Sequence, residues 1–251
     1  MRTCFFCQSS KLTREHIWPD WIVELFPHGH KWRGGIDDTT GRWIRMTPTS
    51  LTHKAKCACG KCNHGWMSDI EGITIPILKP LILSGGEPRI FPSRHQRILA
   101  QWMTLRSMVF ESQVSERQHY YTQQEREAFA KDRSLESLSN IHVWLAPFPG
   151  AHLGAAFFMQ THSTPAKNSG LQVITCHVGQ IAIQFVAWKR FGASVSEFID
   201  KLAATEWPQS TVQIWPCPAG ELLWPPYLSL SPAGFQSLAN RFALDVKFRV
   251  R

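Results

Sequence analysis

Two Cys-x-x-Cys pairs constrain the fold of this chain more than any other feature of its sequence. They are Cys4 with Cys7 and Cys59 with Cys62. This spacing lets two thiolates bind one tetrahedral Zn²⁺ at about 2.3 Å, and two such pairs complete a four-thiolate site. The first pair would lie on a turn and the second would open a helix near Gly60, which is a treble-clef arrangement. No βαβ pattern surrounds either pair, so structural zinc is favoured over a redox role.

The other cysteines and the apolar runs bear on the compartment. Cys57 lies two residues before Cys59 and competes with it as a ligand, whereas Cys176 and Cys217 fall in expected strands and suit buried apolar positions. No apolar run approaches the length of a membrane helix, and no secretory leader is visible. We therefore expect a cytoplasmic protein without membrane contact, in which reduced thiols bind metal instead of forming disulfides.

The hydrophobic pattern divides the chain into two parts. Over residues 1–74 we expect strands at 12–17 and 43–46, helices at 19–26 and 60–72, and a loop or hairpin tip at 28–41. Beyond them, the strongest helix is expected at 93–112, where Trp102, Leu105 and Val109 share one face. Strands are expected at 141–146, 155–160, 171–177 and 180–188, the last three as a meander. The fold class is therefore α+β: a zinc-bound ββα module over 1–74, then an α+β domain with an antiparallel sheet over 75–251.

The net charge points to a polyanionic partner. The formal net charge is +8, and residues 1–66 hold ten Lys or Arg against five Asp or Glu. Such an excess favours nucleic acid, because cations that neutralise phosphates release counterions. The expected phosphate contacts are Arg14, Lys54, Lys56 and Lys61, although a simply solvated surface fits the same residues. Neither a phosphate-binding Gly-rich loop nor a Gly-x-Ser-x-Gly elbow is present, which argues against nucleotide-binding and serine-hydrolase chemistry.

A Glu-His step and an asparagine stand beside the cysteine pairs. Glu15 and His16 precede Pro19, and Asn63 follows the second pair directly. Neighbours on a regular strand point to opposite faces, so Glu15 and His16 can serve one phosphate only if the strand ends or bulges there. Glu71, on the expected helix, fits a solvated carboxylate.

These residues, in this order, resemble the HNH, or His-Me finger, endonucleases that carry a treble-clef zinc site. The resemblance covers about residues 1–74, with a weaker likeness up to the helix around Trp102. It is strongest to a bacterial branch with a Cys-Asn-x-Gly-Trp-Met-Ser tract, matched here by residues 62–68. The resemblance implies hydrolysis of DNA phosphodiester bonds, with zinc holding only the scaffold.

The resemblance also implies a role for each residue. His16 would be the general base that deprotonates the attacking water. Glu15 and Asn63 would bind a catalytic Mg²⁺ or Mn²⁺, which would stabilise the phosphate as the bond breaks. His64 remains an alternative to Asn63 as the helix ligand. The family's middle asparagine is missing from the stretch before the second pair, so either His53 or Thr52 would hold that loop or the role is unfilled.

Many nucleases of this kind work with partner ATPase subunits in restriction or phage defence, so the resemblance implies such a partner as a further hypothesis, in which the chain is inactive alone. The alternative is a non-catalytic treble-clef module that binds nucleic acid or a protein partner. Such a module would hold zinc but would have no second metal site.

Overall fold

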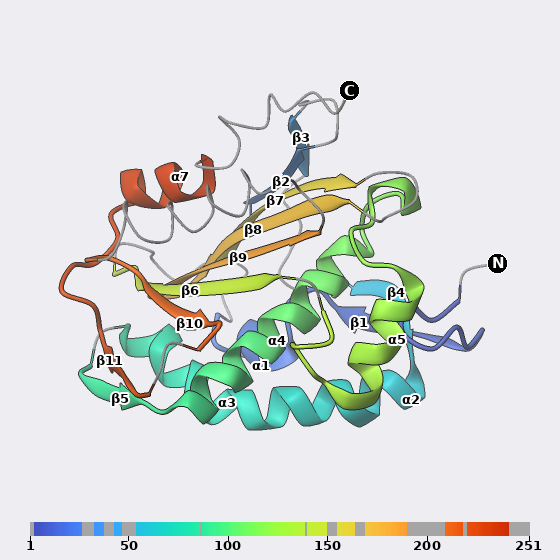
Figure 1. The fold of residues 1–251 in the computed structure, drawn as a ribbon, viewed down its shortest axis with the longest axis horizontal. Helices are drawn as coiled ribbons and strands as arrows, with labels where there is room; N and C mark the ends of the chain where they lie inside the picture. Colours follow the sequence, from blue (N-terminus) through green and yellow to red (C-terminus); the bar gives the residue numbers. More distant parts are fainter. Residues whose placement is uncertain are drawn as a thin grey trace.

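A large sheet with helices on both faces dominates the molecule (Figure 1). The computed structural model describes residues 3–26, 33–37, 43–46, 54–85, 87–138, 140–149, 155–163, 169–189, 209–217 and 220–240. Helices and mainly antiparallel strands are mixed along the chain, so the α+β class predicted from the sequence is confirmed.

The main sheet has seven strands and one parallel pair. In spatial order they are β10 (Val212–Trp215), β6 (Ile141–Pro147), β9 (Ile181–Lys189), β8 (Gly170–Val178), β7 (Ala155–Ser163), β2 (Arg33–Asp37) and β3 (Trp43–Met46). Only β2 and β7 run parallel, whereas β7, β8 and β9 form the expected antiparallel meander. Every residue of β9 is buried, because both faces of the sheet are covered and the strand need not alternate.

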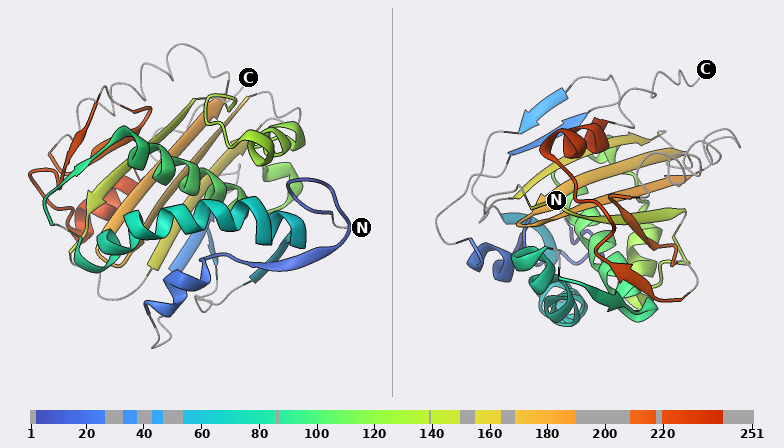
Figure 2. Two further views of the ribbon diagram at one scale, coloured as in Figure 1. Left: turned by 90° about the horizontal axis from the view of Figure 1, so that it is seen from below. Right: turned by 90° about the vertical axis from the view of Figure 1, so that its left-hand side faces the viewer.

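Three helices cover the sheet in layers (Figure 2). Helix α4 (Ser93–Glu111) packs on β9 and β10, and α3 (Ser68–Ser84) packs on α4, farther from the sheet. Helix α7 (Pro232–Asn240) lies on the opposite face, against β8 and β9. Shorter helical segments include α1 (Asp20–Glu24), η2 (Glu116–Gln118) and α5 (Gln123–Asp132). A separate two-stranded pair joins β5 (Arg89–Phe91) to β11 (Leu222–Trp224).

The first cysteine pair leads into a second, smaller unit. Strands β1 (Leu12–His16) and β4 (Lys54–Cys59) pair antiparallel, and we call this pair the N-terminal ribbon. The chain then continues through α2 (Gly60–Cys62) and η1 (Asn63–Met67) into α3, with a kink at Gly65. The order strand, strand, helix matches the expected ββα unit.

Three local expectations differ from the structure. The helix that starts at Gly60 was expected to end near residue 72, but α3 continues to Ser84 through Pro76 and Pro80, because it packs along α4. The boundary expected at residue 74 therefore falls inside α3. Strand β2 occupies part of the expected loop 28–41, since its pairing with β3 and β7 outweighs the turn preference of two adjacent glycines. Cys217 follows β10 and is only partly buried, whereas Cys176 lies buried in β8 as expected.

The end of α3 fits closely against the turn between β8 and β9. Gly85 and Gly179 both have positive φ angles, of 62° and 52°. A Cβ on Gly179 would lie 2.3 Å from the carbonyl oxygen of Ile82, so only glycine fits this contact. The N–H of Gln180 donates to the same oxygen at 2.9 Å, which satisfies a carbonyl that the helix end leaves open.

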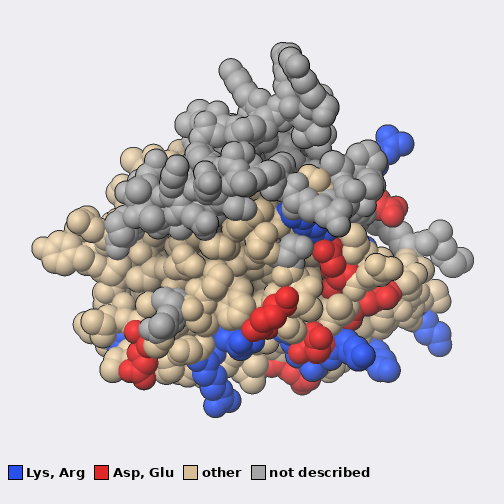
Figure 3. Space-filling model, viewed as in Figure 1, with Lys and Arg blue, Asp and Glu red and all other residues tan. Residues whose placement is uncertain are grey.

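One buried apolar cluster extends from Cys4 and Phe6 to Trp224, and a smaller one lies under α7. On the face shown in Figure 3, acidic and basic side chains are intermixed along the lower and right-hand margins and form no uniform patch. Within the described ranges, every helix is too short or too polar to cross a bilayer.

Candidate metal centre and histidine site

The four cysteines of the two pairs come together as the spacing predicts. Their Sγ atoms all lie within 4.8 Å of one another, and three of the four side chains are buried. Cys4 and Cys7 lie on the turn before β1, Cys59 ends β4, and Cys62 ends α2. The N–H of Cys59 donates to the Sγ of Cys4 at 3.3 Å, a contact that joins the two pairs. Four thiolates in this arrangement could hold one tetrahedral zinc ion.

Cys57 is not part of this cluster. Its side chain is buried on β4, and burial raises the pKa of its thiol to about 12. The Sγ atoms that lie within 4.8 Å of one another are those of Cys4, Cys7, Cys59 and Cys62, without that of Cys57. The competition between Cys57 and Cys59 that the sequence left open is therefore decided for Cys59.

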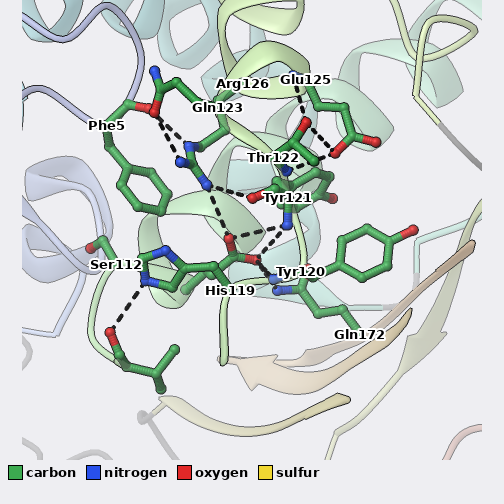
Figure 4. Close-up of polar contacts among 12 residues, drawn as sticks. Phe5, Ser112, His119, Tyr120, Tyr121, Thr122, Gln123, Glu125, Arg126 and Gln172 are labelled. Carbon is green, nitrogen blue, oxygen red and sulfur yellow. Dashed lines mark hydrogen bonds and ion pairs between the residues drawn. The ribbon is translucent and has the colours of Figure 1, made fainter. Parts of the chain in front are cut away.

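A buried ionic network holds the turn between Cys4 and Cys7 against the rest of the fold (Figure 4). Arg126 of α5 donates from Nε to the carbonyl oxygen of Phe5 at 2.9 Å, and its guanidinium carbon lies 3.9 Å from the centre of the Phe5 ring. The same guanidinium pairs with Glu111 of α4 at 3.5 Å. Arg126 therefore links the turn between Cys4 and Cys7 to both α4 and α5.

The N-terminal ribbon separates Glu15 from His16. The register shift of this ribbon lies between Thr13 and Glu15, whereas Glu15 and His16 pair in regular register with Ala55 and Lys54. The strand ends at His16 without a bulge between the two residues, and their side chains have different surroundings. Glu15 is buried, with a relative exposure of 6%, whereas His16 pairs with the exposed Asp20. The expected convergence of Glu15 and His16 on one point is therefore not seen in their contacts.

His16 is held by an acid that the sequence argument missed. Its Nδ1 lies 2.9 Å from Oδ1 of Asp20, four residues later at the start of α1. Burial lowers the pKa of His16 below 6.5, and the positive charges of Lys54 and Arg106 lower it further, against the opposing effect of Asp20 and Glu15. A neutral imidazole with Nδ1 donating to Asp20 leaves Nε2 available to accept a proton.

Three cations surround His16 on the ribbon. Arg14 is two residues before it on β1, so both side chains share one face. Lys54 lies opposite His16 in the register, and Lys56 follows Lys54 on the same face of β4. All three are exposed, as is Lys61 on α2.

Glu15 pairs with a buried arginine. Its Oε1 accepts from Nη2 of Arg106 at 3.1 Å, and the same nitrogen lies 3.0 Å from Oε1 of Glu71. Arg106 is fully buried in α4. Glu71, expected to be a solvated carboxylate, is instead largely buried, and this burial raises its pKa.

Asn63 lies at the other end of β1 from His16. Its Nδ2 donates to Oγ1 of Thr13 at 3.3 Å, and the three residue steps from Thr13 to His16 span about 10 Å of strand. His64 is exposed beside it, while His53 lies outside the described residues. Among the residues that the structure describes, the four cysteines are the one group of three or more Cys, His, Asp or Glu side chains close enough to hold a metal.

Comparisons of this chain with models of known protein families, with curated proteins and with solved structures find no match.

Proposed function

We propose that the protein is an HNH-type nuclease that hydrolyses phosphodiester bonds of nucleic acid, with His16 as the general base. The observation that carries this proposal is the exposed face of the N-terminal ribbon. There His16, with 13% of its side chain exposed, lies opposite Lys54 in the register and two residues after Arg14, and its Nδ1 contacts Asp20. Cations of this kind bind the phosphate backbone, and the imidazole is available to activate water beside it.

The state of His16 suits this role. Because its pKa is lowered, the imidazole is neutral at pH 7 and can accept a proton. The hydrogen bond to Asp20 orients the ring so that Nε2 would take the proton of the attacking water. Arg14 and Lys54 would hold the negatively charged phosphate in reach of that water.

The metals have separate roles in this proposal. Zinc at the four cysteines would fix the turn before β1 and the start of the helix, and so set the geometry of the ribbon. The Mg²⁺ or Mn²⁺ expected at Glu15 and Asn63 fits less well, since the Glu15 carboxylate already pairs with Arg106. The second metal therefore stays a prediction of the family resemblance, and His16 carries the proposed chemistry.

DNA as the substrate, a cytoplasmic setting and a role with an ATPase subunit in restriction or phage defence are further parts of this proposal that rest on the resemblance. The basic ribbon supports a nucleic acid of either kind, because phosphate contacts carry no sequence or sugar information.

A second candidate is the non-catalytic treble-clef module that binds nucleic acid or a protein. The ion pair between Glu15 and Arg106 favours it, because a carboxylate engaged by a buried guanidinium acts as a structural group. Such a module would bind nucleic acid through Arg14, Lys54, Lys56 and Lys61 without cutting it.

The test is plasmid cleavage by zinc-loaded protein with Mg²⁺ or Mn²⁺. His16→Ala should slow cleavage by about 100-fold or more, the usual effect of losing a general base. The matched control is His95→Ala, which removes an imidazole on α4 that contacts Phe91, away from the ribbon. Zinc content and circular dichroism check that both variants fold. Cleavage by the folded His16→Ala protein at the parent rate would refute the assignment of His16 as the general base, and a zinc-loaded parent that cuts no nucleic acid would leave only the binding module.

A further inference from the structure

Arg106 is the centre of a buried contact set that joins three elements. Its Nη2 pairs with Glu15 of β1 at 3.1 Å and with Glu71 of α3 at 3.0 Å, while its Nη1 donates to the carbonyl oxygen of His16 at 3.2 Å. One side chain of α4 therefore contacts both the residue before the proposed base and the backbone of the base itself.

These contacts bear on the role of Glu15. A guanidinium that is fully buried must be neutralised, and Glu15 and Glu71 supply the charge. A divalent cation on the Glu15 carboxylate would lie beside that guanidinium, where two like charges in a buried setting repel each other. The pair with Arg106 and a metal on the same carboxylate are thus competing arrangements.

The planar shape of the guanidinium explains how Arg106 contacts Glu15 and His16 at the same time. A guanidinium presents five donors in a rigid plane, so one arm can hold a carboxylate while the other holds a carbonyl. The carboxylate of Glu15 fixes the plane, and the plane fixes the position of the His16 carbonyl at the end of β1. The imidazole projects from that same residue towards Asp20.

We infer that Glu15 is a positioning residue and not a metal ligand: with Glu71 it holds Arg106, and Arg106 holds the backbone of His16 in place. This inference rests on the proposed role of His16 as the base. It reassigns the one carboxylate that the family pattern would give to a metal, and it adds Arg106 and Glu71 to the groups that support the site.

Paired substitutions of Glu15 distinguish a positioning residue from a ligand. Glu15→Ala removes one of the two carboxylates that pair with Arg106, while Glu15→Gln restores an oxygen acceptor without the charge. A positioning role predicts that the Ala variant changes the nitrogen shifts of the His16 imidazole in NMR spectra and lowers kcat about tenfold, with KM within about twofold. The Gln variant should recover most of both. The Kd for Mn²⁺, measured by electron paramagnetic resonance, should change by less than about twofold in either variant.

Arg106→Lys provides the second test of this inference. Lysine keeps the charge between the two glutamates but lacks the fork, so the His16 carbonyl should lose its donor and the His16 shifts should change. The matched control is Arg97→Lys on the same helix, where the arginine pairs with the exposed Glu136 and does not contact the ribbon. The control should leave the His16 shifts unchanged. Because the Arg106→Lys experiment measures NMR shifts of His16, it tests the positioning role even if Glu15→Ala fails to fold.

Two results would overturn the inference. One is a loss of Mn²⁺ affinity of about tenfold or more in both Glu15 variants with unchanged His16 shifts, which is the behaviour of a metal ligand. The other is an Arg106→Lys protein whose His16 shifts match the parent. A parent protein that cuts no nucleic acid would refute the proposed function alone, since the NMR readout reports the position of His16 without any cleavage.

Discussion

Replacement of Glu111 should destabilise the protein far more than replacement of an equally well-paired surface glutamate. Glu111 is fully buried in α4 and accepts hydrogen bonds from the N–H groups of Tyr120 and Tyr121 and from Nε2 of Gln172, besides its ion pair with Arg126 (Figure 4). The Glu111→Gln substitution keeps the shape of the side chain but removes its charge.

The expected cost follows from what remains buried. Loss of one member of a buried ion pair costs about 3–5 kcal/mol, because the other charge is left without compensation. Here that charge is the guanidinium of Arg126, whose pKa burial already lowers. The amide would also turn two donor hydrogens towards a site lined with donors. We therefore expect Glu111→Gln to lower the free energy of unfolding by about 4 kcal/mol.

Urea unfolding of the zinc-loaded protein, followed by tryptophan fluorescence, measures this cost. A loss of about 4 kcal/mol lowers the urea midpoint by roughly 1–4 M. The control is Glu136→Gln, which breaks the 2.6 Å pair with Arg97 at a glutamate side chain that is 54% exposed. Exposed pairs contribute about 1 kcal/mol or less. Equal midpoints for Glu111→Gln and Glu136→Gln would refute the assignment of Glu111 as a buried structural charge.

The remaining predictions concern the cysteines and two histidines. Cys57→Ser should keep the zinc content of the parent, since Cys57 lies outside the four-cysteine cluster, whereas Cys4→Ser should lose zinc. Elemental analysis measures both, and zinc loss in Cys57→Ser would contradict the ligand set. The cleavage rate should rise with pH through a midpoint below 6.5, because burial lowers the pKa of His16. Asp20→Asn should move that midpoint lower still, because the Asp20 charge raises the pKa of His16. A pH–rate profile of the parent with a midpoint above 6.5 would argue against His16 as the base. Burial lowers the pKa of His177 from 6.5 to about 4, so its imidazole is neutral at pH 7 in the folded protein. The unfolded chain takes up this proton first as the pH falls from 6.5 towards 4, and about 3 kcal/mol of stability should be lost over that range. His177→Phe should remove that loss, as urea midpoints at both pH values would show.

Local sequence patterns predicted the features that depend on few residues. The cysteine cluster follows from two thiols three residues apart on a turn, and helix α4 follows from the spacing of Trp102, Leu105 and Val109. The strand that carries His16 and the helix that starts at Gly60 were also placed correctly. In each case the signal lies within a few turns or one strand of chain.

The missed features depend on contacts between distant parts of the chain. Arg106 is four residues after Trp102, so it shares the face of α4 that the pattern predicts to be buried, and a buried cation requires an anion. That signal was available, but its partner Glu15 lies 91 residues away and only the fold identifies it. Glu71 was interpreted as a solvated carboxylate for the same reason, because its partner Arg106 lies on another helix. Asp20 is only four residues after His16, so its missed contact was within reach of a local argument.

The parallel pairing of β2 with β7 affects the order in which parts of the chain can fold during translation. The strand that lies between the two cysteine pairs completes its hydrogen bonds only with a strand from the second half of the chain. During translation, the first cysteine pair, β2 and the second pair leave the ribosome long before β7 does. Zinc capture can therefore close the early segment into a loop first, and the late strand must then dock onto an edge that this loop presents.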